Sequence, residues 1–327
     1  MKVEQKPAPT DNTIAADAAG IAEAARILRH GGLVAMPTET VYGLAADASS
    51  EAAVERIYAA KGRPSSNPLI AHVPSLEAAL EQGIFSHHAL GLARKFWPGP
   101  LTLVVPLGPS ASVCSAARAG LCTIALRVPA HPVALALLAE TGKPLAAPSA
   151  NRSGRVSPVT AAHVARDLGG EIDLILDGGR CEIGLESAVV ECLDAPRLLR
   201  PGGIARHDIE AVLGCPLAQA MGPGAPRSPG MLKSHYAPRA KLRLEAAALD
   251  EGEAGLDFGG IFGKHKNVLD LSPRRDLAEA AANLFAHLRE LDGREPAAIA
   301  VAPVPFEGLG EAINDRLRRA AAPRPRA

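Results

Sequence analysis

The alternation of short apolar segments with helical stretches is the feature that most constrains how this chain can fold. Asp17–His30 carries apolar residues at helical spacing, and a buried strand is expected directly after it, over Leu33–Met36. Ser50 is placed to cap a further helix that runs through Ala60. Such alternation is typical of α/β proteins, in which helices cover a sheet. Further strands are expected at Leu69–Val73, Leu101–Leu107, Cys122–Val128, Leu145–Ala147, Leu174–Leu176 and Ser187–Cys192, and further helices at His88–Phe96, Pro132–Glu140, Pro158–Leu168 (capped by Ser157) and Asp208–Leu213.

Composition excludes several classes of protein. The chain has 327 residues, of which 47% are hydrophobic, enough for a packed core. Lys+Arg and Asp+Glu both number 35, whereas a protein that coats nucleic acid is normally basic. The five cysteines are odd in number and form no C-x-x-C pair, which disfavours a disulfide framework or a zinc site. No apolar run approaches the roughly 20 residues of a membrane helix and no signal peptide is visible, so we expect a cytoplasmic protein.

A stretch rich in proline and glycine, Cys215–Ala240, interrupts the α/β pattern and indicates a linker. Strand and helix signals then resume. The predicted organisation is therefore a catalytic domain over 1–214, a linker over 215–240 and a small α/β domain over 241–327. In that last domain we expect strands at Lys241–Leu244 and Ala297–Ala302 and helices at Asp276–Leu291 and Glu307–Arg319. We interpret its terminal arginines as a solvated helix end, with an RNA contact as the alternative: Arg316, Arg318, Arg319, Arg324 and Arg326.

Polar segments follow several of the expected strands, where α/β proteins bind ligands. They read PTETVYGL from Pro37, KGRPSSNPL from Lys61, APSANRSG from Ala147, GLES from Gly184 and LRPGG from Leu199. Taken alone, each segment is more simply explained as an ordinary turn, except that the segment from Lys61 fits a basic helix end and a phosphate site equally well. Together they bring cations and hydroxyls to strand ends with few carboxylates, which favours a pocket for an anionic small molecule. The cations are Lys61, Arg63, Arg127 and Arg200.

These motifs, together with FWPGPLTLVV, LRVPAHP and SPGMLKSHYAP, occur in the order and spacing of the threonylcarbamoyl-adenylate synthases. The chain resembles the long form of that family, which has a YrdC-type domain and a smaller C-terminal domain. The resemblance implies a twisted mixed sheet flanked by helices and a second, Rossmann-like α/β domain. It implies a nucleotidyltransferase that converts L-threonine, bicarbonate and ATP to L-threonylcarbamoyl-AMP and pyrophosphate, for modification of adenosine 37 in tRNA.

The resemblance also implies the roles of individual residues. Lys61 and Arg63 are expected to be catalytic, and Mg²⁺ is expected to accompany ATP, with no resident metal. His235 and Tyr236 of the linker motif are expected to form a lid. The residues implied for L-threonine are Thr40, His72, Arg127, Ala147 and Ser187. Those implied for ATP are Lys61, Arg63, Asn67, Thr123, Ser149, Asn151, Arg200 and Tyr236.

Two other functions stay open from the sequence. One is a module that binds double-stranded RNA or a nucleotide, and the zero net charge speaks against RNA. The other is a carbamoyltransferase that uses carbamoyl phosphate, although related enzymes carry C-x-x-C zinc fingers and an acylphosphatase region that this chain lacks. Transient contact with RNA or with the tRNA threonylcarbamoyl transferase machinery is expected, and contact with a membrane is not.

Overall fold

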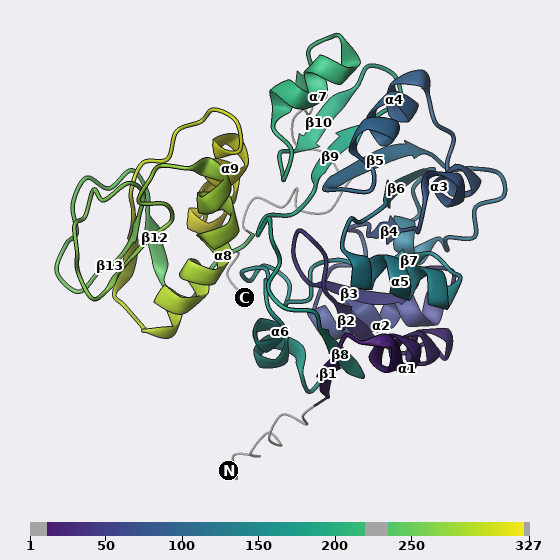
Figure 1. Cartoon of the computed structure of the whole chain (residues 1–327), viewed down its shortest axis with the longest axis horizontal. Helices are drawn as coiled ribbons and strands as arrows, with labels where there is room; N and C mark the ends of the chain where they lie inside the picture. The colour runs from purple at the N-terminus through teal and green to yellow at the C-terminus, as the bar shows by residue number, and fades with distance from the viewer. Residues whose placement is uncertain (1–11, 220–234, 324–327) are drawn as a thin grey trace.

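The computed structural model describes residues 12–219 and 235–323, which form two lobes, each built on its own sheet (Figure 1). The sheet of the larger lobe is mixed, and eleven of its strands lie among the described residues. In spatial order they are β1 (Thr13–Ala15), β8 (Leu174–Asp177), β2 (Val34–Met36), β3 (Gly43–Asp47), β7 (Leu145–Ala146), β4 (Ile70–His72), β6 (Thr123–Arg127), β5 (Leu101–Pro106), β9 (Ala188–Glu191), β10 (Arg197–Arg200) and β11 (Ala218–Gln219).

Helices cover both faces of this sheet. Along β2, Val34 and Met36 belong to one buried cluster with the helix residues Leu28 and Leu137, while Ala35 belongs to another that includes helices of the opposite face. A strand buried on both faces carries a continuous apolar run, which is the pattern of this segment. The helices are α1 (Ala18–Arg29), α2 (Glu51–Lys61), α3 (Leu76–Gln82), α4 (His87–Phe96), the 3₁₀ turn η1 (Ala116–Arg118), α5 (Pro132–Thr141), α6 (Ala161–Leu168) and α7 (Arg206–Leu213).

Most of the predicted elements of this lobe are confirmed to within two residues. The Asp17 and Ser50 side chains cap α1 and α2, accepting hydrogen bonds from backbone N–H groups of the first turn. The predicted start of α6 is wrong. The helix begins at Ala161 and is capped by Thr160, because the hydroxyl of Ser157 instead donates to a carboxylate. The short elements β1, β3, α3, β10 and β11 were not predicted.

The smaller lobe is a parallel sheet in the order β12 (Lys241–Arg243), β15 (Ala298–Val301), β13 (Ala254–Asp257) and β14 (Val268–Asp270). Its helices α8 (Leu277–Gly293) and α9 (Gly310–Ala321) lie on the side that faces the larger lobe (Figure 1). The predicted α/β character of this region is confirmed. Strands β13 and β14 were not predicted.

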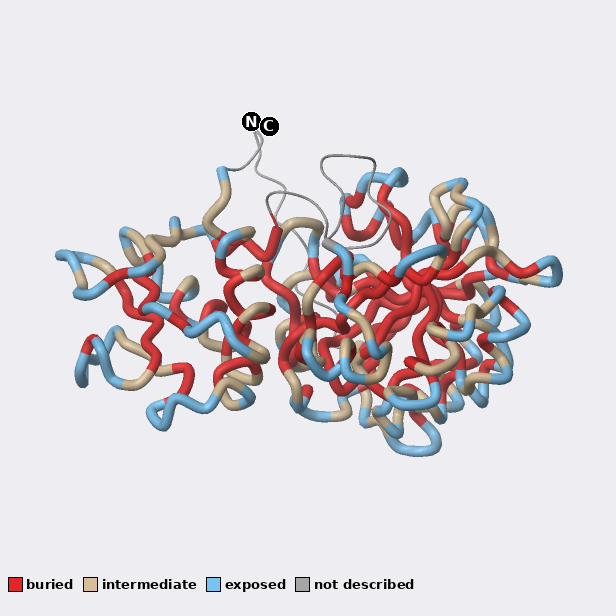
Figure 2. The backbone as a smooth tube through the Cα atoms, turned by 90° about the horizontal axis from the view of Figure 1, so that it is seen from above, coloured by how far each residue is buried: buried red, intermediate tan, exposed pale blue. Residues whose placement is uncertain are grey.

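One buried core runs through both lobes. Phe285 and Leu284 of α8 belong to the same apolar cluster as Val156 and Leu185 of the larger lobe. Figure 2 shows buried backbone in each lobe and where they meet. The predicted domain boundaries stay predictions, and residues 220–234 of the predicted linker lie outside the described residues. Among the described helices, none is both long enough and apolar enough to cross a membrane.

Candidate active site

A cavity lies at one edge of the large sheet. The parallel strands β4 and β6 place His72 beside Arg127 at the last position of both strands. Ser187 directly precedes β9, and Arg200 ends its antiparallel neighbour β10. Ligands of open α/β sheets bind at strand ends of this kind. The cavity is lined by Thr38, Thr40, Val41, Gly43, Arg63, Ile70, His72, Arg127, Ala147, Pro148, Ser149, Glu186, Ser187, Arg200, His235 and Tyr236.

Three buried arginines face this cavity, as the sequence predicts. Arg63 donates to the carbonyls of Asn67 (3.2 Å) and Pro68 (3.0 Å), and Arg200 donates to the carbonyl of Ser187 (2.8 Å). Arg127 is fixed by a 2.6 Å ion pair with Glu39. Burial lowers the pKa of Arg63 to about 10, so this guanidinium is still charged at neutral pH. The three cations are therefore oriented before any anion arrives.

Lys61 lies behind the cavity wall and does not line it. Its Nζ donates to the carbonyls of Ser149 and Asn151, each at 2.5 Å, and so fixes the loop that follows β7. Burial, together with the nearby Arg63 guanidinium, holds the pKa of Lys61 well below its ordinary value. The structure thus brings Lys61 next to Ser149, while its catalytic role stays a prediction.

Two neutral histidines also line the cavity. Burial, reinforced by Arg127, lowers the pKa of His72 to about 3. Burial lowers the pKa of His235 to about 3 as well, and Arg63 and Lys61 oppose its protonation further. At neutral pH both imidazoles can accept a hydrogen bond from a ligand but are too weak as bases to remove a proton efficiently.

Besides Lys61, three other residues expected to contact ATP do not line the cavity: Asn67, Asn151 and Thr123. Asn67 is buried beside Arg63, and neither its amide oxygen nor its amide nitrogen has a hydrogen-bond partner among the described residues. Asn151 donates to two backbone carbonyls. Thr123 lies at the far end of β6 from Arg127, about 13 Å away at the usual rise per residue. Their contacts with ATP remain predictions.

Glu186, in the GLES segment, lines the cavity, although no site role was predicted for it. Its side chain accepts from the Ser157 hydroxyl (2.5 Å) and from Arg316 of α9 (2.9 Å). The interpretation of the last helix as a solvated basic end is therefore wrong for Arg316, which is 0% exposed because it shares the apolar face of α9 with Leu317. Arg318 is exposed, and Arg324 and Arg326 lie outside the described residues.

The segment His235–Ala237 closes one side of the cavity. Tyr236 has a φ of +61°, a left-handed conformation that is costly for a residue with a Cβ atom. Its buried ring stacks on Phe285 of α8 at 5.6 Å. The Ala237 N–H donates to the carbonyl of Gly154 at 2.8 Å, which joins this segment to the loop that Lys61 fixes. Two residues expected to form a lid are thus in place at the cavity.

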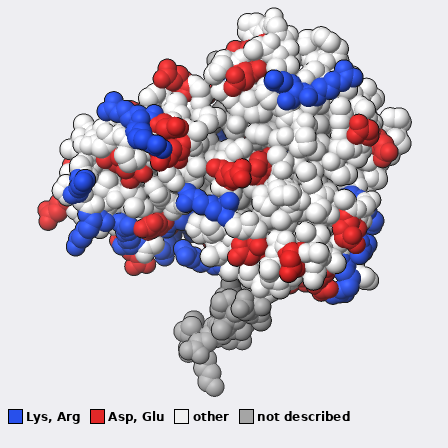
Figure 3. Space-filling model, viewed as in Figure 1, with Lys and Arg blue, Asp and Glu red and all other residues white. Residues whose placement is uncertain are grey.

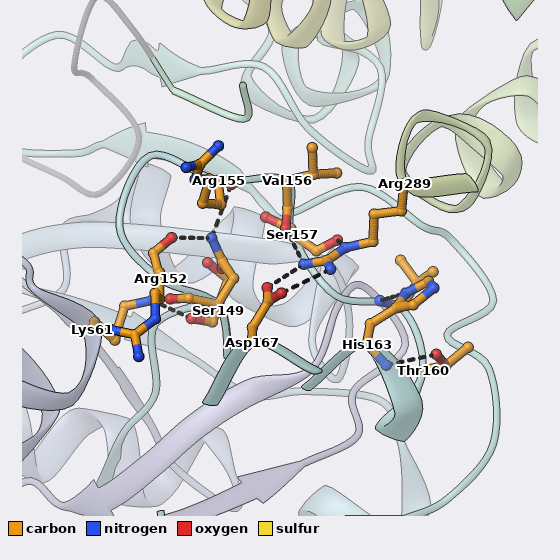
Figure 4. A network of polar contacts seen from close by, with 12 residues as sticks. Lys61, Ser149, Arg152, Arg155, Val156, Ser157, Thr160, His163, Asp167 and Arg289 are labelled. Atoms are coloured by element: carbon orange, nitrogen blue, oxygen red, sulfur yellow. Dashed lines mark hydrogen bonds and ion pairs between the residues drawn. The ribbon is translucent and has the colours of Figure 1, made fainter. Parts of the chain in front are cut away.

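A second buried arginine joins the lobes beside this loop. Figure 4 shows Arg289 of α8 reaching Asp167 and the carbonyls of Val156 and Ser157, with Lys61 and Ser149 close by. The ion pair with Asp167 measures 2.5 Å. The outer surface differs from the arginine-lined cavity. On the face shown in Figure 3, positive and negative side chains are interspersed. That face offers no continuous basic surface of the kind that binds a nucleic-acid backbone.

Each lobe matches the model of a known protein family. A family model described as "Telomere recombination" matches residues 26–202, and one described as "Threonylcarbamoyl-AMP synthase, C-terminal domain" matches residues 204–322. The chain is 44% identical to a threonylcarbamoyl-AMP synthase of Bacillus subtilis, with 92% of each chain covered. It is 42% identical to one of Pyrococcus abyssi, covering 91% of this chain and 92% of the relative.

A solved structure supports the same assignment over the whole fold. The crystal structure of P. abyssi Sua5 complexed with L-threonine matches with a TM-score of 0.85 and 39% identity, covering 92% of this chain and 94% of that one. The expected two-part fold is therefore confirmed. The chain belongs to the threonylcarbamoyl-AMP synthase family, in the form that carries the additional C-terminal domain.

Proposed function

We propose that this protein makes L-threonylcarbamoyl-AMP, pyrophosphate and water from L-threonine, bicarbonate and ATP. The observation that carries the proposal is the shared cavity: all five residues expected to bind threonine, and both arginines expected to bind ATP, line it. A reaction that joins an amino acid to a nucleotide needs both substrates side by side. The related proteins named threonylcarbamoyl-AMP synthase support the same activity.

The threonine end of the cavity combines one cation with small polar groups. Arg127 is charged and fixed by Glu39, and is suited to a carboxylate. Thr40 and Ser187 bring hydroxyl groups, and Ala147 brings its backbone. The Nδ1 atom of His72 has no hydrogen-bond partner among the described residues. As a neutral imidazole nitrogen it can accept a hydrogen bond from the amino or hydroxyl group of threonine.

The nucleotide end is formed by Arg63 and Arg200 with Ser149 and Tyr236. Two guanidinium groups fixed by backbone carbonyls suit the negative charge of a triphosphate. The buried, unpartnered amide of Asn67 supports a polar ligand beside Arg63. Among the described residues no cluster of His, Cys, Asp or Glu is arranged to hold a metal ion. We therefore propose that Mg²⁺ enters on the phosphates of ATP, as part of the substrate.

The chemistry needs positioning and positive charge more than a strong base. The neutral amino group of threonine forms a carbamate with bicarbonate, with loss of water. A carbamate oxygen then attacks the α-phosphorus, and the bond to pyrophosphate breaks. Two anions must approach each other in this step, so fixed cations that offset their charge lower the barrier. We propose that Arg63 and Arg200 do this directly and that Lys61 fixes the loop around Ser149.

The product is a reactive mixed anhydride, which is expected to be consumed by the threonylcarbamoyl modification of adenosine 37 in tRNA. We propose a cytoplasmic location and transient contact with the transferase machinery or with RNA. The family assignment supports bicarbonate use and these contacts.

Substrate omission tests the proposed reaction. The full-length protein is incubated with Mg²⁺, ATP, L-threonine and bicarbonate, and pyrophosphate and threonylcarbamoyl-AMP are measured. Product is expected only when all three substrates are present. Product that requires carbamoyl phosphate in place of bicarbonate would instead indicate a carbamoyltransferase. Intact ATP in the complete mixture, from protein shown to be folded by circular dichroism, would refute the proposal.

A further inference from the structure

Arg316 belongs to the smaller lobe but contacts the wall of the cavity in the larger lobe. Its Nε donates to Glu186 at 2.9 Å, and its Nη1 donates to Asp315 at 2.7 Å. Glu186 lines the cavity, and the Arg316 side chain is 0% exposed. A charged side chain buried this completely is retained only with close partners. The last helix of the small lobe therefore brings a buried cation to the wall of the binding site.

The same cation contacts the segment that closes the cavity. The Arg316 guanidinium lies 5.1 Å from the centre of the Tyr236 ring. One turn further along α9, the carbonyl of Arg319 accepts from the His235 N–H at 3.2 Å. Phe285 packs on Tyr236 at 5.6 Å. Contacts from both helices of the small lobe thus stabilise Tyr236 in its left-handed backbone conformation.

The negative charge of Glu186 explains why position 316 needs an arginine. Glu186 is the one carboxylate among the residues that line the cavity, next to Ser187, whose carbonyl accepts from Arg200. An unpaired carboxylate there would repel phosphate groups and reduce the effective charge of Arg200. Burial by itself would raise the pKa of Glu186, but Arg316 and Arg200 hold that pKa below its usual value, so the carboxylate is ionised. Arg316 provides the balancing charge from behind the wall.

We propose that Arg316 is a positioning residue for the nucleotide end of the cavity. It neutralises Glu186, which leaves the charge of Arg200 available for phosphate, and it fixes Tyr236 against the bound nucleotide. The small lobe would then contribute to ATP binding without touching ATP. This inference rests on the proposed function for the identity of the nucleotide, and it predicts an effect on ATP that exceeds the effect on threonine.

Calorimetric titration separates the two substrates. Arg316→Met keeps an unbranched side chain that can pack among apolar neighbours, but it removes the guanidinium and its charge. We expect it to weaken binding of ATP with Mg²⁺ by about tenfold or more, because it leaves a buried carboxylate unpaired at the site, and to change L-threonine affinity by less than about twofold. Arg318→Met, the same change at an exposed position of α9, is the matched control and is expected to alter neither affinity.

Two further variants separate electrostatics from packing. In Arg316→Met combined with Glu186→Gln, the unpaired charge is gone, so ATP affinity is expected to recover most of the loss. Arg316→Lys keeps the charge and is expected to lie between the wild type and Arg316→Met. The double variant keeps the charges balanced, and Arg316→Lys keeps the positive charge. Both variants therefore test the role of the Arg316 charge even if urea unfolding shows that Arg316→Met does not fold.

The outcomes are distinct. If Arg316→Met weakens ATP and threonine binding equally, or if the double variant binds ATP no better than Arg316→Met, Arg316 acts only on stability and the inference is wrong. If the wild type binds both substrates and Arg316→Met binds ATP as tightly, the inference fails while the proposed function stands. If the wild type binds neither substrate, both fail.

Discussion

Acid is expected to destabilise this protein through His72 and His235. Both are at most 6% exposed, and both have a pKa of about 3, against about 6.5 in an unfolded chain. Between these two values the unfolded state binds one more proton at each site, so the free energy of unfolding falls as the pH falls. The slope is about 1.4 kcal/mol per pH unit for each histidine, or roughly 4 kcal/mol for both between pH 7.5 and pH 5. The less buried His163, whose pKa is also lowered, acts in the same direction.

Urea unfolding between pH 5 and pH 7.5, followed by circular dichroism, measures this slope. His235→Gln removes one titrating group, so its free energy of unfolding is expected to fall about 2 kcal/mol less than that of the wild type over this range. His207→Gln is the control, since the side chain of His207 is 72% exposed, and its slope is expected to equal that of the wild type. Equal slopes for His235→Gln and the wild type would refute the claim that buried neutral histidines cause the acid sensitivity.

Three further predictions follow from single contacts. Arg63→Met is expected to lower kcat/KM for ATP by about 100-fold or more. The control Arg94→Met, at an exposed position, is expected to leave kcat/KM unchanged. Similar kcat/KM values for the two variants would show that the loop after α2 does not bind ATP. Arg289→Met leaves the half-buried carboxylate of Asp167 unpaired and is expected to reduce the free energy of unfolding by about 2–3 kcal/mol. An unchanged urea midpoint would contradict the assigned ion pair. Gly184→Ala places a Cβ atom 2.7 Å from the α8 backbone at a φ of +71°, and we expect it to lower the free energy of unfolding by about 1–3 kcal/mol. Gly91→Ala, in open space within α4, is expected to raise it by about 0.5–1 kcal/mol. A change of the same sign in both variants would contradict the close contact at Gly184.

The larger lobe was predictable where its segments are long and apolar. β5 and β6 stand out because Leu, Val and Ile follow one another between turn residues. β3 was not predicted because its sequence, GLAAD, has small residues with weak strand preference. In the small lobe, β13 and β14 have only four and three residues and end in aspartate. Their strand character comes from pairing across the sheet and is not visible locally.

The site was predictable where single strand ends carry the chemistry. Arg127 ends the predicted strand β6, which places it at the edge of the sheet. Arg200 was included through its LRPGG segment, but the strand that it ends, β10, was not predicted, and the pairing of β10 with β9 brings it to the same edge. The pairing of Glu186 with Arg316 spans 130 positions and has no local signature. One signal was present, because Arg316 lies three residues after Ile313, which places a charge on the apolar face of α9. An arginine at such a position needs a buried partner.

The ion pair between Glu186 and Arg316 also sets an order of events during synthesis. All the described residues that line the cavity precede Pro238 in the chain, whereas Arg316, which lies behind the cavity wall, belongs to the last helix described. Until that helix has been synthesised, Glu186 cannot form its ion pair with Arg316, and its charge is offset only by Arg200 nearby. A messenger truncated within the codons for α9 would therefore yield a protein that looks nearly complete and still lacks the counterion of its substrate pocket.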